Sequence, residues 1–257
     1  MLAAMVALMV AAIPVVWAQQ TAQPQAAAKQ EDKSGTNPLN FQTEFRFFNE
    51  VQFLQGRGYQ NVTTLQYVQP FAGSFAVRMR LPIVSNDVTG SNKYGVGDLN
   101  AKVNWVPFVN SKVGVMLGSE FSFNTASNRV LGTGKNTIAP VGVLAFFLKD
   151  GWLFAPAYQQ TKSYAGDDSR SDINLGAADF YLVKLTKSKR NWFILDPTII
   201  ADYRNDRVSG TLEFEAGQIA GRMMGGIGSI YIRPGVGLGN NRIYNWNLEV
   251  GFKLIGF

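Results

Sequence analysis

The sequence predicts an all-β fold, a transmembrane antiparallel β-barrel of about twelve strands. Three observations lead to this prediction. Apolar and polar residues alternate along most of the chain, the connectors between alternating segments are long and short in turn, and an apolar targeting-type segment opens the sequence. A period of two is typical of a strand with one apolar face and one polar face.

The last fourteen residues show the alternation most clearly. The apolar set consists of Tyr244, Trp246, Leu248, Val250, Phe252 and Leu254, and the residues between them are Asn245, Asn247, Glu249, Gly251 and Lys253. A helix would need apolar residues three and four apart, so it would scatter this set over all its sides. The segment is therefore predicted to be a strand, and the same pattern recurs upstream.

The composition excludes several functional classes. The chain of 257 residues is 46% hydrophobic and 16% charged, and it contains neither Cys nor His. Disulfides, thiolate chemistry, His-containing catalytic triads and His-bound zinc are therefore excluded. The net charge of +6 comes from basic residues interspersed with acids and not from basic runs, so we expect no nucleic-acid partner. No motif predicts a cofactor.

The amino-terminal region divides into three parts. Residues 1–18 are predicted to be a signal peptide, because Leu2 to Val16 is almost wholly apolar and Val16-Trp17-Ala18 fits a small-residue cleavage site. Residues 19–40 are rich in Gln and Ala and are predicted to form a flexible periplasmic linker. The barrel is expected to cover residues 41–257.

The alternating segments give the expected strands. They cover residues 41–53, 61–70, 75–83, 99–105, 112–126, 136–148, 152–163, 171–186, 192–204, 208–220, 227–238 and 244–257. Most are close to the roughly 9–11 residues that a tilted membrane strand requires. Pro140, Pro156, Pro197 and Pro234 lie within them, and we expect each to mark a bulge or a strand end because proline cannot donate to the ladder.

The connectors alternate in length by parity. Those after even-numbered strands are short, at residues 72–73, 110–111, 150–151, 187–190 and 222–226. The first four after odd-numbered strands are longer and polar, at residues 55–60, 85–94, 127–135 and 165–170, although the asymmetry fades toward the carboxy terminus. Short turns at one end and long loops at the other are typical of outer-membrane barrels.

A membrane barrel explains these features better than a soluble one. About twelve strands would enclose more volume than side chains readily fill if the apolar face pointed inward. In lipid the apolar face points outward, and closure satisfies every backbone hydrogen bond where no water can. A soluble lipocalin-like barrel or a sandwich is the alternative.

Two stretches carry a resemblance to known proteins. Tyr94-Gly95-Val96-Gly97-Asp98-Leu99 resembles the Gly-x-Gly-Asp-Leu signature of Gram-negative outer-membrane barrels of the phenol meta-pathway degradation (MetA-type) transporter family. The terminal Phe257 resembles the assembly signal of outer-membrane proteins. The resemblance implies a place in the Gram-negative outer membrane, contact with its lipid and lipopolysaccharide, recognition by the barrel-assembly machinery, and a small aromatic or apolar solute.

The terminal signal departs from the usual pattern in one respect. Lys253 and Glu249 share the parity of Phe257, whereas the apolar residues Tyr244 to Leu254 hold the other parity. Either a bulge near Leu254-Ile255 restores the parity or Phe257 lies beyond the strand.

The polar face of the strands is the candidate functional surface. Its ionisable residues are predicted to line the lumen, since charges at membrane depth line a cavity or pair with one another. They are Glu44, Arg46, Arg78, Arg80, Asp98, Lys102, Glu120, Asp196, Asp202, Glu213, Glu215, Arg233 and Glu249. This set predicts a path for small solutes. The alternatives are a closed salt-bridged network in a structural or adhesive barrel, and an outer-membrane hydrolase.

The sequence also predicts how these charges are distributed. Arg46, Arg78 and Arg80 come from the first and third strands, whereas Asp196, Asp202, Glu213 and Glu215 lie near the opposite wall of a twelve-strand barrel. Opposed walls of unlike sign would produce a transverse field or direct ion pairs. In a polar connector, Asp167, Asp168 and Asp172 are a calcium candidate, but Arg170 among them favours a solvated loop.

Overall fold

The computed structural model describes residues 32–56 and 58–257. The predicted signal peptide, residues 1–18, lies outside the described residues. The strands are β1 Glu44–Leu54, β2 Tyr59–Phe71, β3 Phe75–Asn86, β4 Lys93–Val96, β5 Leu99–Val109, β6 Val113–Phe123, β7 Lys135–Phe147, β8 Trp152–Gly166, β9 Asn174–Leu185, β10 Asn191–Asp202, β11 Arg207–Met223, β12 Gly226–Leu238 and β13 Tyr244–Ile255. One 3₁₀ turn, η1 Lys149–Gly151, joins β7 to β8. In the described residues no helix has the length and apolar character to cross a membrane.

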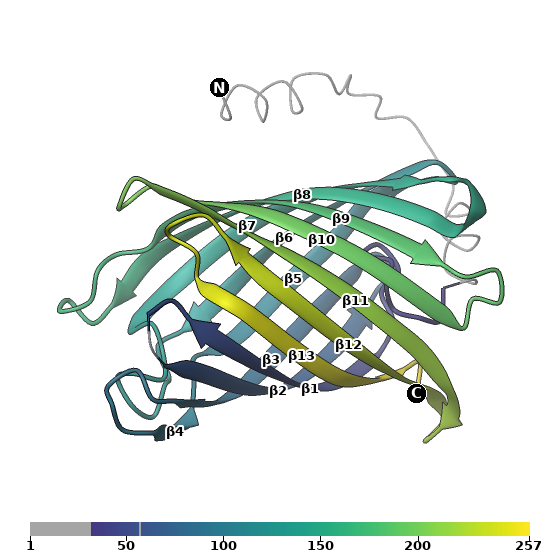
Figure 1. The fold of residues 1–257 in the computed structure, drawn as a ribbon. Coiled ribbons are helices and arrows are strands. Elements are labelled where there is room, and N and C mark those ends of the chain that lie inside the picture. Colours follow the sequence, from purple (N-terminus) through teal and green to yellow (C-terminus); the bar gives the residue numbers. More distant parts are fainter. Residues whose placement is uncertain (1–31, 57) are drawn as a thin grey trace, which may run out of the picture.

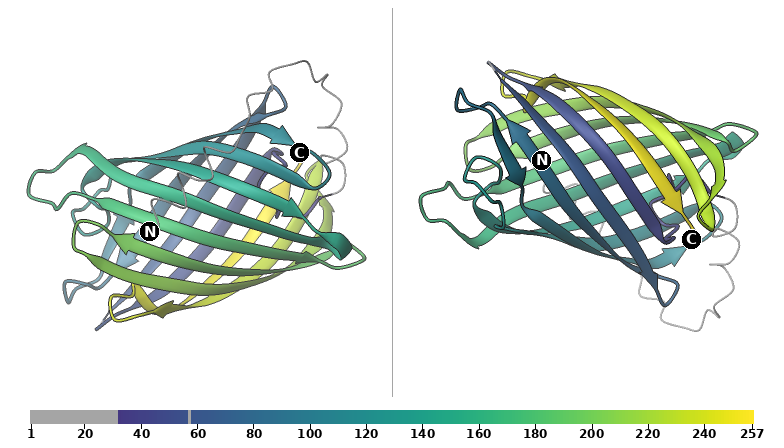
Figure 2. Two further views of the ribbon diagram at one scale, coloured as in Figure 1. Left: turned by 90° about the horizontal axis from the view of Figure 1, so that it is seen from above. Right: turned by 90° about the horizontal axis from the view of Figure 1, so that it is seen from below.

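The thirteen strands form a single sheet that closes on itself. Each strand pairs antiparallel with its neighbours, and β1 pairs with both β2 and β13, which closes the sheet between its first and last strands (Figures 1 and 2). β4 pairs only with β3, so the other twelve strands form the barrel wall. The predicted all-β barrel of about twelve strands is therefore confirmed, and β4 is an addition that the alternation did not predict.

The four wall prolines singled out in the sequence, Pro140, Pro156, Pro197 and Pro234, do not behave as expected. On one side of each, pairing continues through the proline, as in Ser119 with Pro140 and Pro197 with Leu212. With the other neighbouring strand, the ladder has a gap at the proline, but the register is the same before and after this gap. The expectation of bulges or strand ends is therefore wrong. Proline lacks one N–H, so only one of its two neighbouring strands loses a hydrogen bond.

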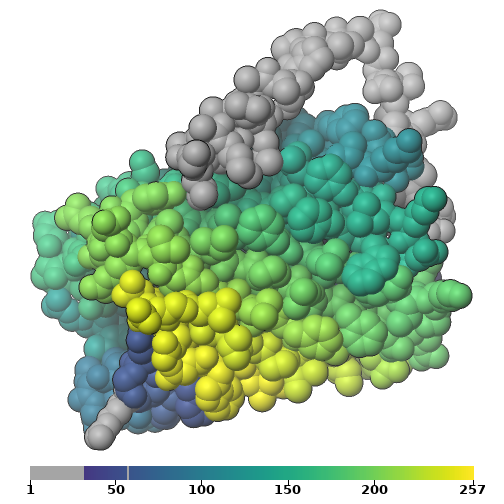
Figure 3. Space-filling model, turned by 45° about the horizontal axis from the view of Figure 1, so that its top comes forward, coloured from purple at the N-terminus to yellow at the C-terminus, as the bar shows by residue number. Residues whose placement is uncertain are grey.

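The outer face of the barrel is apolar. Large exposed side chains occur on strands all around it, for example Phe47 on β1, Met79 on β3, Val103 on β5, Leu117 on β6, Ile199 on β10 and Val250 on β13. In the space-filling view the outer surfaces of β10 to β13, coloured green to yellow, join without a break (Figure 3). A water-soluble barrel would place these side chains inside.

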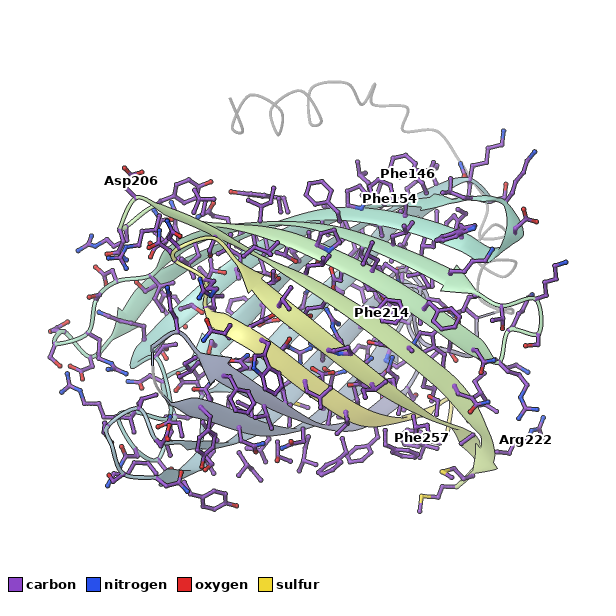
Figure 4. The ribbon with its side chains drawn as sticks, viewed as in Figure 1. Phe146, Phe154, Asp206, Phe214, Arg222 and Phe257 are labelled. Carbon is purple, nitrogen blue, oxygen red and sulfur yellow. The ribbon has the colours of Figure 1, made fainter. Side chains whose placement is uncertain are left out.

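Stacked aromatic pairs lie toward both ends of this outer face. Phe146 stacks on Phe154 with ring centroids 6.3 Å apart, and both lie on the outer side of the barrel (Figure 4). At the opposite end Phe53 stacks on Trp246 at 4.0 Å. Two aromatic bands flanking an apolar belt are the usual interfacial anchors of a membrane barrel.

The two ends of the barrel differ in their connectors. The turn end has the connectors 72–74, 110–112, 148–151, 186–190 and 224–225, together with the start of β1 and the end of β13. The loop end has the connectors 55–58, 87–98, 124–134, 167–173, 203–206 and 239–243. The parity of the connectors is as expected, and so is its weakening toward the carboxy terminus.

Phe257 lies beyond the last strand. The pairing of β1 with β13 runs without a shift from Glu44 with Ile255 to Phe53 with Trp246, so no bulge occurs near Leu254. Gly256 follows with φ of 69°, and its N–H donates to the Thr43 carbonyl at 2.8 Å. The second of the two sequence interpretations is therefore the right one.

Candidate functional site

The interior of the barrel holds two charged clusters. The first lies on β3, β5 and β6. Arg78, Lys102 and Glu120 are register neighbours on adjacent strands, and Arg78 forms an ion pair with Glu120. We call this set, with Arg80, the basic cluster. It has three cations and one carboxylate.

A hydrogen-bonded chain extends this cluster onto β1. Arg80 Nε donates to Gln66 Oε1 at 2.7 Å, and Gln66 Nε2 donates to Glu44 Oε1 at 2.8 Å. Glu44 also accepts from Arg46 Nε at 2.9 Å. Arg80 lies 6.0 Å from the centre of the Phe48 ring, a geometry that favours a cation–π contact.

The second cluster lies on β10 to β13, and acids dominate it. Arg233 forms ion pairs with Asp196, with Glu213 at 2.5 Å and with Glu215 at 3.9 Å. Lys253 Nζ pairs with Glu215 at 3.2 Å. Uncharged side chains also donate hydrogen bonds to the carboxylates of this acidic cluster. Trp192 donates to Glu215 at 2.6 Å, Tyr231 to Glu249 at 2.5 Å and Tyr244 to Glu213 at 2.8 Å. Asn247 donates to Glu213 at 2.9 Å and to Glu50 at 2.8 Å.

Among the described residues, no ion pair joins the basic cluster to the acidic cluster. In the acidic cluster, Arg233 and Lys253 pair with Asp196, Glu213 and Glu215 from the same side of the barrel. The Tyr231 ring of the acidic cluster lies near cations of both β1 and β13, with Arg46 5.9 Å and Lys253 4.6 Å from its centre. Of the two arrangements expected for opposed walls, direct ion pairs from Arg78 or Arg80 to the predicted acids do not occur among the described residues.

Two of the predicted lumen residues lie at the loop end and organise backbone there. Asp98 accepts hydrogen bonds from the N–H groups of Thr125, Ala126 and Thr133, and thereby folds the connector 124–134 toward β5. Asp202 accepts from the N–H groups of Arg204 and Asn205 and closes the turn after β10. Neither residue belongs to the charged clusters.

Asp167 and Asp172, two of the three aspartates of the calcium candidate at the loop end, each bind other partners. Asp172 pairs with Lys135 Nζ at 3.0 Å, and this hydrogen bond and charge hold the pKa of Asp172 below its ordinary value. Asp167 lies 4.0 Å from Arg129 and accepts from Ser169. Arg170 donates to the carbonyls of Arg129, Gly132 and Thr133, so it clamps the connector 124–134.

A third part of the interior is apolar. A buried cluster lines β5 to β10 toward the turn end, and we call it the apolar wall. Its members on those strands are Val106, Met116, Val141, Val143, Ala145, Leu153, Ala155, Val183, Trp192 and Ile194. The sequence signal was present, because 136–148 and 152–163 are more continuously apolar than the other strands, and strands buried on both faces have this character.

The segment before β1 covers the apolar wall. Leu39 is 9% exposed and packs within the same buried cluster. Tyr181 Oη on β9 donates to the Thr36 carbonyl at 3.2 Å. The sequence predicts a flexible periplasmic linker at residues 19–40, and in the described part of that stretch Leu39 and Thr36 contact the inner wall. In Figure 1 this purple segment lies within the outline of the barrel at the end that holds the carboxy terminus.

Comparison with solved structures finds the same barrel fold in other proteins. An outer-membrane channel from Pseudomonas putida F1 matches with a TM-score of 0.67 at 12% identity, covering 87% of this chain and 99% of that one. The NanC porin matches at 0.56 and 14% identity over 84% and 99% of the two chains, and the KdgM porin at 0.53 and 13% over 82% and 98%. No family model matches the sequence, and no curated protein does.

At these identities the likeness shows the fold. The resemblance to the phenol meta-pathway family stays a prediction.

Sequence reasoning missed several interior residues that the charged clusters use. Lys253 and Glu50 stand on the polar faces of their strands, so the alternation itself would have found them. Gln66, Trp192 and Tyr231 carry no charge and gave no signal. They were missed because an uncharged donor on an inner face looks like any other polar or aromatic strand residue.

Proposed function

We propose that the protein is a channel of the Gram-negative outer membrane that admits small solutes through the barrel interior. The closed sheet, the apolar outer belt and the two aromatic bands support membrane insertion, because closure leaves no backbone group unpaired in lipid. The turn end would face the periplasm and the loop end the exterior. Lipid and lipopolysaccharide would then surround the barrel.

One observation gives the main support for a solute path through the barrel. In the described part of the chain, no carboxylate lies within ion-pairing distance of Arg80 or Lys102, although both side chains point into the barrel. A purely structural network would pair its buried charges, because an unpaired charge away from water is costly. Unpaired cations on an inner wall favour a water-filled path. The predicted lumen residues of the two clusters would line it.

The solute class is also part of the proposal. The apolar wall supports a solute with an apolar body, and the family resemblance adds small aromatic or apolar compounds. Passage requires no cofactor and no chemical step. A structural or adhesive barrel and an outer-membrane hydrolase are the alternatives, and the hydrolase would have to work without His or Cys.

Ion selectivity tests the path directly. The double variant Arg78→Glu/Arg80→Glu reverses the charge of the basic cluster, so its reversal potential in a KCl gradient should shift toward cation preference relative to wild type. The variant Arg78→Lys/Arg80→Lys keeps the charge and is the control. An unchanged reversal potential, or a double variant that cannot assemble, would mean that the arginines belong to a closed structural network.

A further inference from the structure

We propose that residues 32–43 form a movable plug, which closes the turn end of the lumen when seated and opens it when released. The proposal rests on the channel function above and adds a gate to it. The segment is continuous with β1, so its attachment point at Thr43 and Glu44 stays in the wall whichever position the plug takes.

The plug crosses the interior from one side to the other. Near its start, a Cβ added to Gly35 would stand 2.6 Å from Cδ1 of Ile255 on β13. Farther along, Leu39 lies against Gly114 on β6. β13 and β6 are five steps apart in a closed wall of twelve strands, which places them on nearly opposite sides.

The wall has a seat shaped for the plug. A Cβ added to Gly114 would overlap Cδ2 of Leu39, so the missing side chain of Gly114 makes the notch that Leu39 fills. Ser34 and Thr36 are also almost fully buried, at 1% and 3% exposure. The seated plug is therefore a fitted part of the interior.

The plug is held together mainly by its own hydrogen bonds. The Asp32 carboxylate accepts from the N–H groups of Ser34 and Asn37, each at 2.8 Å. The Asp32 carbonyl accepts from Gln42 Nε2 at 2.8 Å and from Asn40 Nδ2 at 3.2 Å. The plug can thus leave its seat as one body without losing its internal structure.

The bonds from the plug to the wall are few by comparison. Within the described chain, residues 32–43 make two hydrogen bonds to the wall. Tyr181 donates to the Thr36 carbonyl, and the Gly256 N–H donates to the Thr43 carbonyl at the attachment point. A cavity of about 440 Å³ lies beside the plug, with Asn37 on one side and Trp152 and Leu185 on the other. The plug thus has two apolar anchors, Leu39 and Phe41, few hydrogen bonds to the wall and free space beside it. These features describe a part that can exchange between two positions, unlike a strand held by a full ladder.

A reversible cross-link tests the plug, because the sequence contains no Cys. The pair Leu39→Cys/Gly114→Cys puts two short side chains where the leucine tip now fills the notch, and disulfides need Cβ atoms about 3.5–4.5 Å apart. We expect the oxidised protein to lose its current in planar bilayers and to regain it after reduction. The single variant Leu39→Cys, oxidised and reduced in the same way, controls for the reagents.

A second variant removes the seat without a cross-link. Gly114→Ala places a methyl group against Leu39, so it should unseat the plug and increase the fraction of time spent open. Gly142→Ala is the matched control, since its nearest neighbour there is Leu117 Cδ2 at an ordinary 3.9 Å.

The outcomes separate the plug from the channel. Equal current in the oxidised and reduced double variant, or a double variant that forms no cross-link, would overturn the plug and leave the channel function standing. Equal open time in Gly114→Ala and Gly142→Ala would count against it in the same way. The absence of current in every form, including reduced protein and Gly114→Ala, would overturn the channel function and the plug with it.

Discussion

At the scale of the residue, the side of the wall on which a side chain lies decides what it can be. Val103 is exposed on the outer face of β5, whereas Asn100 on the same strand points inward and donates to Ser122 Oγ at 3.0 Å. Three positions apart on one strand, the two residues have opposite surroundings. The alternation of apolar and polar residues in the sequence predicts this difference.

A pair of charge insertions tests the assignment of the two faces. Val103→Arg should cost about 2–4 kcal/mol of unfolding free energy if the residue is near the bilayer midplane. Asn100→Lys should have a much smaller effect, because its side chain enters the interior. Reversible urea unfolding in lipid vesicles measures both, and equal losses at the two positions would show that the faces are wrongly assigned.

Arg233 should contribute more to stability than Arg80. It is the shared partner of Asp196 and Glu213, so Arg233→Gln leaves two carboxylates without their cation and should cost about 3 kcal/mol. Arg80→Gln removes a cation that has no carboxylate partner and should cost less. The same unfolding experiment compares them, and a larger loss for Arg80→Gln would contradict the described division of roles.

At the scale of the element, alternation predicted the twelve wall strands but not the parts that depart from it. β4 has four residues, too few for a period to show. Residues 32–40 contain one large apolar residue, Leu39, and a single anchor cannot be recognised from composition. The apolar inner faces of β7 and β8 were visible as continuously apolar runs, but the segment that covers them could not be predicted from those runs.

The carboxy-terminal element leads to a prediction about assembly. β13 closes the barrel by pairing with both β1 and β12, and Phe257 follows it directly. If Phe257 is the assembly signal, Phe257→Ala should lower the amount of folded protein in outer membranes while refolding of the purified variant stays normal. Comparable reductions in cells and in purified refolding would instead indicate a packing role, in which Phe257 contacts Gly226.

At the scale of the whole molecule, solute passage requires a barrel embedded in lipid with a path through it. The structure provides closure, an apolar belt and a charged interior, and the similar solved structures provide the same fold. The sequence predicted the barrel because the alternation of apolar and polar residues that produces the belt recurs in nearly every wall strand, and such a repeat is visible in a single sequence. It did not predict how the charges pair, because that depends on which strands lie side by side.

Extraction and gel mobility test the membrane location. The protein should remain in the outer-membrane fraction after salt or carbonate washing, and unboiled detergent samples should migrate differently from boiled ones, since a closed barrel resists unfolding by detergent. Recovery of the folded protein in the soluble periplasmic fraction would contradict insertion.

Single-channel recording of the purified protein in planar bilayers is the decisive test of solute passage through the barrel. We expect discrete current steps from the wild-type protein and longer open periods from Gly114→Ala, in which the seat of the plug is blocked. Properly folded protein that inserts and gives no steps in either form would show that the interior is closed, and that the barrel has a role other than solute passage.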